Sequence, residues 1–260
     1  MGELVAVGGL VVSSDSLKVI GDDLEAICSD TQFAVPTDEN LKWSPAKGSW
    51  LRDNLSGHVR QELFGNMLDC VAAHGSIAIV AISDKTCKQA NSLASDHEVD
   101  ATLLALERFD TWLGHRTGLV FVSKPAGGTT DANKFVAECI EHKLTGTKYV
   151  GFDSLALNPV VMPAWQSRLL QVADLITSIT NAKVAGGNHF ADALFPKILE
   201  MMPTTNKGFK GGAGLKIHPS FRYRNLYHWV LGDDHYVEGS SGVVLPERDK
   251  PYPKDEMKWS

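Results

Sequence analysis

Long apolar runs are absent from this chain of 260 residues. No stretch reaches the roughly 18 apolar residues that a membrane-spanning helix needs. The first residues, "MGELVAVGGLVVSSD", contain neither a basic segment nor a small-residue cleavage motif, so they do not predict a signal peptide. We therefore expect a cytoplasmic protein that has no membrane partner.

Cysteine is also scarce. The four cysteines, Cys28, Cys70, Cys87 and Cys139, stand far apart and form no C-x-x-C pair. This spacing predicts neither a disulfide framework nor a zinc knuckle, and it suits a reducing compartment. The plainest interpretation is that all four serve as small buried apolar side chains.

The common catalytic signatures are missing as well. The chain has no P-loop, no G-x-S-x-G nucleophile elbow and no H-E-x-x-H motif, and Gly8-Gly9 lies inside a strand pattern rather than in a dinucleotide-binding loop. The formal net charge is -6 and the sequence pI is about 5.8. These values argue against a globally basic nucleic-acid binder, although they permit a local basic patch.

What the chain does contain is an alternation of strand and helix patterns. Near-continuous apolar runs at Leu4–Val12, Ser76–Ser83 and Gly118–Ser123 predict strands covered on both faces. A shorter run at Ser154–Val161 includes Pro159, which favours a sheet edge. Together with the intervening helical patterns, these runs predict an α/β fold with a central mixed sheet flanked by helices. The predicted helices span residues 16–29, 54–74, 96–113, 130–142 and 163–184.

The composition changes after Pro203, where glycine, basic and aromatic residues become frequent. We therefore predict an α/β domain over residues 1–202 and a C-terminal extension packed on it over residues 203–260. Basic residues interleaved with aromatic ones could follow a phosphate backbone and stack on bases, whereas Tyr227 and Trp229 could equally pack on the core. The candidate substrate-binding residues of this extension are Lys210, Lys216, Arg222 and Arg224.

The segment "RLLQVADLITSITNA" predicts a helix whose polar side carries a single charge, Asp174. A solvated helix face usually carries several charged residues. The narrow stripe of Gln171, Asp174 and Thr177 could therefore face solvent or line a polar cleft, and the pattern leaves both interpretations open.

Two further acidic residues accompany predicted strands and loops. Asp84 follows directly after the strand at Ser76–Ser83, at the end where open α/β sheets bind ligands. Glu39 precedes "LKWS" in a loop. Carboxylates gathered from a strand end and a helix are what metal-assisted phosphoryl chemistry requires, because Mg²⁺ prefers oxygen ligands.

Several of these segments, in this order, resemble one known family. The helix "SRLLQVADLITS" resembles the Q-L/V-A-D-L helix of the domain-of-unknown-function family 3800, an RNase H-like family. Four other segments resemble that family's strands and its E-I/L-K-F/W-S motif: "VAVGGLVV", "NLKWS", "AIVAISDK" and "GLVFVSKPAGG". "GLKIHPSFRYRNLYHWVLGD" resembles the C-terminal part of one branch, so the resemblance covers most of the chain.

The resemblance implies an RNase H-like fold and a metal-dependent nuclease site that holds Mg²⁺ or Mn²⁺. Asp174 corresponds to the helix acid and Gln171 to its companion, while Asp84 corresponds to the acid after the middle strand. Lys42 corresponds to the lysine of the E-I-K segment and Glu39 to its neighbouring acid. Asp174 and Asp84 are therefore the candidate metal ligands, and Asp174, Asp84, Lys42 and Glu39 the candidate catalytic residues.

Two departures from the family pattern support an alternative. The relatives open with a strand resembling Y-I-D-E-S-G-D, which has no counterpart in this sequence, and Ser123 stands where they carry an acid. Serine is a poorer ligand for Mg²⁺ than a carboxylate is. The alternative function is a catalytically degenerate relative that binds nucleic acid or protein. The sequence does not predict an oligomeric state.

Overall fold

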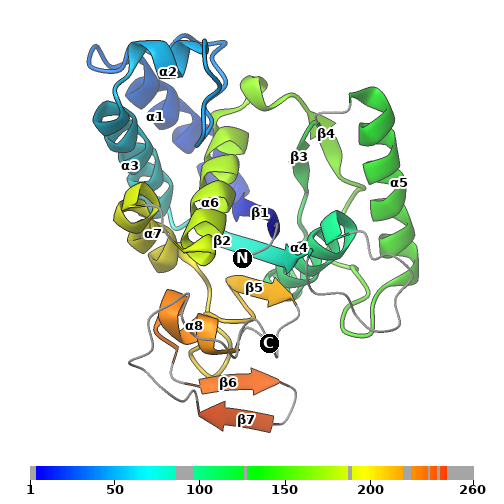
Figure 1. The fold of residues 1–260 in the computed structure, drawn as a ribbon. Helices are drawn as coiled ribbons and strands as arrows, with labels where there is room; N and C mark the ends of the chain where they lie inside the picture. The colour runs from blue at the N-terminus through cyan, green and yellow to red at the C-terminus, as the bar shows by residue number, and fades with distance from the viewer. Residues whose placement is uncertain are drawn as a thin grey trace. The chain divides into compact units, whose positions relative to one another are not determined.

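The computed structural model describes residues 4–85, 97–125, 128–186, 189–218, 224–233, 235–238 and 241–244. Helices and strands both occur along these residues, as Figure 1 shows. In chain order they are β1 (Leu4–Val11), the 3-10 helix η1 (Ser14–Ser16), α1 (Leu17–Ser29), α2 (Trp50–Asn54), α3 (Gly57–Ala73), β2 (Ile77–Asp84), α4 (His97–Leu113), β3 (Phe121–Ser123), α5 (Thr129–Thr145), β4 (Val160–Met162), the 3-10 helix η2 (Ala164–Gln166), α6 (Arg168–Ala185), α7 (His189–Met201), β5 (Leu215–His218), α8 (Arg224–Leu231), β6 (His235–Glu238) and β7 (Ser241–Val244).

The chain divides into two compact units, each assembled from separate stretches of sequence. Unit 1 consists of Met1–Gly8, Ile77–Ala105 and Ile176–Ser260, and unit 2 consists of Gly9–Ser76 and Leu106–Leu175. Three of the boundaries fall inside β1, α4 and α6, and the fourth lies directly before β2. The sequence-based division at residue 202 stays a prediction, although β5 belongs to a sheet rather than to a separate extension.

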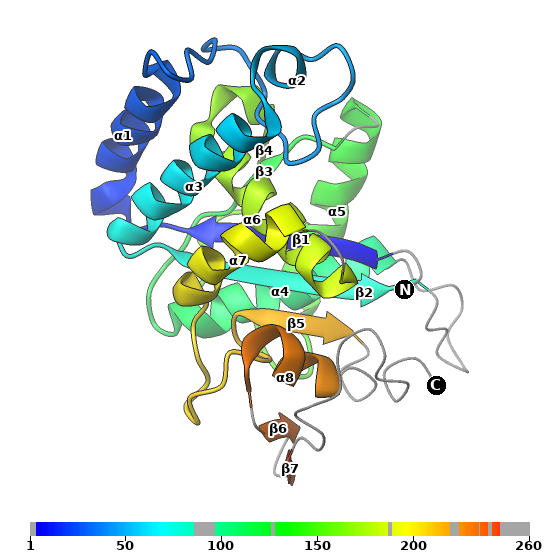
Figure 2. The same cartoon turned by 60° about the vertical axis from the view of Figure 1, so that its left-hand side comes forward.

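The sheet of unit 1 has β2 at its centre, between β1 and β5, and Figure 2 shows the three strands side by side. β2 pairs with β5 in parallel, with Ser83 opposite His218. Every residue of β2 after Ile77 is buried, which confirms the predicted central strand. β1 is only half-buried along its length, so the prediction that both of its faces are covered is wrong. Its place at the edge of the described sheet leaves one side of the strand without a neighbour.

Two of the helices that contribute to the described core of unit 1 are α7 and α8. α7 packs against β2 and buries Leu194, Phe195 and Ile198, although Pro196 lies inside the helix. On α8, Tyr227 is 2% exposed, and its hydroxyl accepts the backbone N–H of Ile217 on β5 at 2.8 Å. The interpretation that Tyr227 packs on the core is therefore confirmed.

Unit 2 is mainly helical. α1 and α3 pack together through apolar positions at helical spacing, which include Ile20 and Leu24 on α1 and Met67 on α3. Ser56 begins α3 as its N-cap, and its side-chain oxygen accepts the N–H of Val59. β3 and β4 form a separate parallel pair, with Phe121 opposite Val160. These strands are shorter than the sequence predicts.

Taken together, the elements confirm the α/β class, with a small mixed sheet and flanking helices. The predicted helices at residues 16–29, 96–113 and 130–142 correspond to α1, α4 and α5. α7 and β5 were not predicted. Among the described residues, no helix is both long enough and apolar enough to cross a membrane.

Candidate functional sites

Asp84 is the last residue of β2 and is 1% exposed. Because side chains alternate along a strand, it lies on the same face of the sheet as Val80. α6 covers this face at Val80: a Cβ atom placed on Gly8 would lie 2.9 Å from Cγ2 of Val80 and 2.7 Å from Oγ1 of Thr177. The carboxylate of Asp84 thus points to the α6 side, at the carboxyl end of the sheet's central strand.

The opposite face of the same strand end carries a histidine pair. The hydroxyl of Ser83 lies 2.9 Å from Nδ1 of His97 on α4, and His218 is the partner of Ser83 on β5. Burial lowers the pKa of His218; Asp100 opposes this effect, while Lys216 and His97 add to it. Ser83 is fully buried, so this hydroxyl positions His97 rather than offering a nucleophile to a substrate. Neither histidine was predicted as a site residue from the sequence, because only strand pairing and helix packing bring the two together.

The lowered pKa of His218 predicts a pH-dependent stability. Folding disfavours the imidazolium form, so the contribution of His218 is complete above pH 6.5, its ordinary pKa, and is lost as the pH falls below that value. We expect the free energy of unfolding in urea to fall between about pH 7.5 and pH 5.5, and to fall less in His218→Gln. Equal pH slopes for the two proteins would contradict the assignment.

In unit 2, Asp174 and Lys42 lie near each other. Both side chains are exposed, so Asp174 is accessible to solvent. Nevertheless, desolvation by the surrounding protein raises the pKa of Asp174, and the positive charge of Lys42 partly offsets this increase. The structure therefore brings together two residues that the sequence predicted for one site. Their catalytic roles stay predictions.

The other two predicted residues of this region have structural partners. The backbone carbonyl of Glu39 accepts from Arg168 Nη1 at 2.9 Å and from Gln171 Nε2 at 3.3 Å. The Glu39 carboxylate accepts the N–H of Leu51 in the first turn of α2 at 3.3 Å. Gln171 is fully buried, so its amide holds the Glu39 segment in place and presents no surface to a ligand in this structure.

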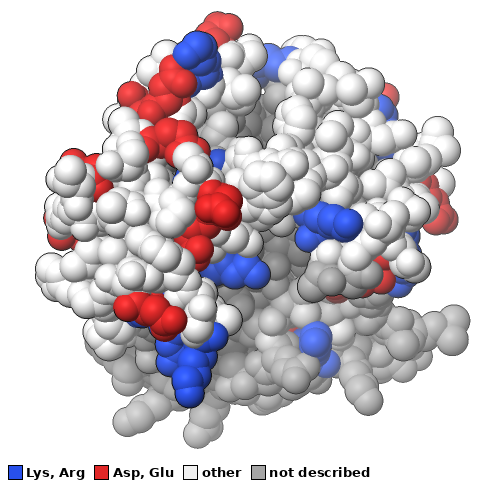
Figure 3. Space-filling model, turned by 90° about the horizontal axis from the view of Figure 1, so that it is seen from above, with Lys and Arg blue, Asp and Glu red and all other residues white. Residues whose placement is uncertain are grey.

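The predicted basic residues of the C-terminal segment are placed only in part. Lys210 is half-buried, and its ammonium donates to the backbone carbonyl of Leu199. Lys216 is half-buried on β5. Arg222 and the side chain of Arg224 lie outside the described residues. On the face drawn in Figure 3, the basic side chains of the described residues stand in small separate groups, whereas acidic side chains gather at the upper left.

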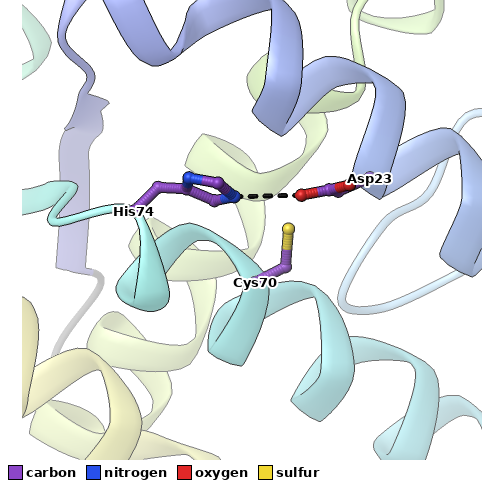
Figure 4. A group of neighbouring side chains, drawn as sticks. All are labelled: Asp23, Cys70 and His74. Carbon is purple, nitrogen blue, oxygen red and sulfur yellow. Dashed lines mark hydrogen bonds and ion pairs between the residues drawn. The ribbon is translucent and has the colours of Figure 1, made fainter.

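A third group of polar side chains was not predicted. Asp23 on α1 and Cys70 on α3, together with His74 directly after α3, have potential ligand atoms that all lie within 4.8 Å of one another (Figure 4). Among the described residues, this is the group of three or more histidine, cysteine or acidic side chains with such spacing. The four-residue interval between Cys70 and His74 is visible in the sequence, but Asp23 joins them only through helix packing.

The two metal ligands expected from the sequence, Asp84 and Asp174, belong to unit 1 and unit 2 respectively. Their pairing in one site therefore stays a prediction of the sequence resemblance. No protein-family model matches the chain, and comparisons with curated proteins and with solved structures also find no match.

Proposed function

We propose that the chain has an RNase H-like fold and acts as a metal-dependent nuclease on nucleic-acid phosphodiester bonds. The observation that best supports this function is the position of Asp84, whose carboxylate is nearly fully buried at the carboxyl end of the central strand. Open α/β sheets bind their ligands at that end.

The donor chemistry of Asp84 suits a hard divalent cation. Mg²⁺ and Mn²⁺ bind carboxylate oxygens, and a bound ion stabilises negative charge on phosphate oxygens. Asp174 stays the second ligand that the resemblance predicts. Lys42 lies near Asp174 and is exposed, so its ammonium could pair with a phosphate group.

A second candidate function is non-catalytic binding of nucleic acid or protein on the same fold. The hydrogen bonds of Glu39 and Gln171 favour it, because both side chains serve the local structure rather than a ligand. Metal-independent binding distinguishes this candidate from the first. A degenerate relative would bind an oligonucleotide equally well in EDTA and in Mn²⁺, and Asp84→Asn would leave that binding unchanged.

A metal titration tests the nuclease proposal. We expect the full chain to bind Mn²⁺, measured as loss of the free-ion signal in electron paramagnetic resonance, and to cleave labelled single- or double-stranded oligonucleotides only when Mn²⁺ or Mg²⁺ is present. Asp84→Asn should weaken Mn²⁺ binding by about tenfold or more and abolish cleavage, because a neutral amide is a poorer ligand for a hard cation.

Asp131→Asn is the matched control, because Asp131 is an exposed acid in the first turn of α5. It should bind Mn²⁺ and cleave like the parent. Absence of Mn²⁺ binding by the parent chain at millimolar concentration, or equal affinities for Asp84→Asn and the parent, would rule out this metal site.

A further inference from the structure

The group formed by Asp23, Cys70 and His74 lies entirely in unit 2, and it shares no residue with the proposed nuclease site. Cys70 belongs to the last turn of α3, and His74 directly follows the helix. Residues four apart on a helix project from the same face, so this spacing aims both side chains at α1. Figure 4 shows the sulfur of Cys70 beside the carboxylate of Asp23, with the imidazole of His74 facing the same carboxylate.

Helix packing supplies the third member. α1 packs against α3, and it buries Ile20 and Leu24 while leaving Asp23 on its exposed side. The position of Asp23 therefore depends on the core that the two helices share rather than on a loop. Such a rigid support is what holds metal ligands in place.

The distances between the potential ligand atoms are close to those around a tetrahedral ion. Nε2 of His74 lies 2.9 Å from Oδ2 of Asp23, and the three potential ligand atoms all lie within 4.8 Å of one another. Bond lengths of about 2.0–2.3 Å to nitrogen, oxygen and sulfur place tetrahedral ligand atoms about 3.3–3.6 Å apart. Small side-chain rotations would therefore open space for an ion between the imidazole and the carboxylate.

The chemical types of the three potential ligand atoms indicate which metal ion the group would bind. One thiolate, one imidazole and one carboxylate form a mixed soft and hard set that suits Zn²⁺ and disfavours Mg²⁺ and Ca²⁺. Three protein ligands leave a fourth position for water or a small anion. The side chains of His74 and Asp23 are 28% and 51% exposed, so solvent can reach that position.

A simpler interpretation is that His74 and Asp23 form only a surface ion pair. That pair explains the contact at 2.9 Å, but it gives no role to the thiol of Cys70, whose pKa is raised by burial and by the nearby Asp23. A bound cation would neutralise the carboxylate and favour the thiolate.

From this geometry we infer that Asp23, Cys70 and His74 form a binding site for one Zn²⁺ ion with an open coordination position. The site is independent of the proposed nuclease centre. It would tie α1 to α3 at the end of α3, so bound Zn²⁺ would also stabilise unit 2 by binding the folded state alone.

Cobalt substitution tests the inference in the full, metal-free chain under reducing conditions. Added Co²⁺ should produce a thiolate-to-metal charge-transfer band and the visible absorption of tetrahedral cobalt, and one equivalent of Zn²⁺ should remove both. Cys70→Ser should abolish the charge-transfer band. Asp23→Asn and His74→Gln should each weaken Co²⁺ binding by about tenfold or more.

Two control variants make the result specific. Cys139→Ala removes a buried cysteine on α5, and it should leave the cobalt spectrum unchanged. Asp84→Asn should leave the thiolate-to-metal charge-transfer band unchanged, which separates this site from the proposed nuclease centre. If the parent chain shows no charge-transfer band at millimolar Co²⁺, or if Cys70→Ser and His74→Gln bind like the parent, the inference is overturned. Because the two substitutions act on different ligands, a folding defect in one leaves the other decisive.

Discussion

Replacing Arg168 with methionine will lower the free energy of unfolding by about 3 kcal/mol, because several acceptors each lose a charge-assisted hydrogen bond. Arg168 is 4% exposed at the start of α6. It donates to the backbone carbonyls of Pro36 at 3.0 Å and Glu39 at 2.9 Å, and to the side-chain oxygen of Gln171 at 2.9 Å. Methionine fills similar space but donates nothing. The side-chain oxygen of Gln171 would lose the donor described here, and each backbone carbonyl would keep one bond: Pro36 from the N–H of Glu39 at 3.1 Å and Glu39 from Gln171 Nε2 at 3.3 Å.

Arg168→Lys should recover only part of this loss. The guanidinium bonds through two of its nitrogens to the segment at residues 36–39, and a third nitrogen lies 3.2 Å from the Glu25 carboxylate. An ammonium is a compact charge that cannot reproduce this fork. We expect the lysine variant to remain about 2 kcal/mol less stable than the parent.

Urea unfolding followed by circular dichroism measures both changes. Arg116→Met is the control, since Arg116 also donates to two carbonyls, those of Leu113 and Trp112, but is exposed. Water can replace those bonds, so its cost should stay below about 1 kcal/mol. Equal losses of stability in the two methionine variants would contradict the role given to the burial of Arg168.

Gly8→Val will destabilise the chain by about 1–3 kcal/mol through overpacking, whereas Gly9→Val will change stability by less than about 0.5 kcal/mol. A Cβ at residue 8 would lie 2.7 Å from Oγ1 of Thr177 and 2.9 Å from the backbone oxygen of Ile79. The backbone oxygen is fixed by the sheet, so strand and helix would have to separate. At residue 9, no described atom lies within 4 Å of a Cβ atom.

The neighbouring glycines form a matched pair, because both lie in β1 and valine favours strands at either position. Thermal and urea unfolding of the two variants give the comparison. Equal destabilisation would mean that the loss of backbone freedom, rather than the contact with Thr177, explains why glycine is needed at residue 8.

The parts of the fold that the sequence predicted are those with long, regular apolar patterns. β2 is a run of buried residues, and α1 places Ile20 and Leu24 at helical spacing. α7 has an equally regular pattern in Leu194, Phe195 and Ile198, but Pro196 within it argues against a helix on local grounds. The burial of three large apolar side chains outweighs the hydrogen bond that proline cannot make.

β5 could not be predicted in the same way. Four residues, "LKIH", are too short to show a period, and the strand forms because β2 offers a pairing edge. The residues of the candidate sites differ in the same way between those that a local pattern predicts and those that only tertiary contacts bring together. Asp84 was found because it directly follows an apolar run, whereas His218 and Asp23 join their neighbours only through strand pairing and helix packing.

The pairing of β2 with β5 also determines the order in which the protein can fold during synthesis. Its paired residues, such as Val80 and Leu215, lie 135 positions apart. Both stretches of unit 2 have been translated by Leu175, whereas unit 1 still lacks its third stretch. The apolar strand β2 therefore remains without its parallel partner while the residues between β2 and β5 are translated, and an unpaired strand edge of this kind is prone to aggregation. A nascent chain that stalls between α6 and β5 would expose this edge, so the cell's chaperones would be needed most at that stage.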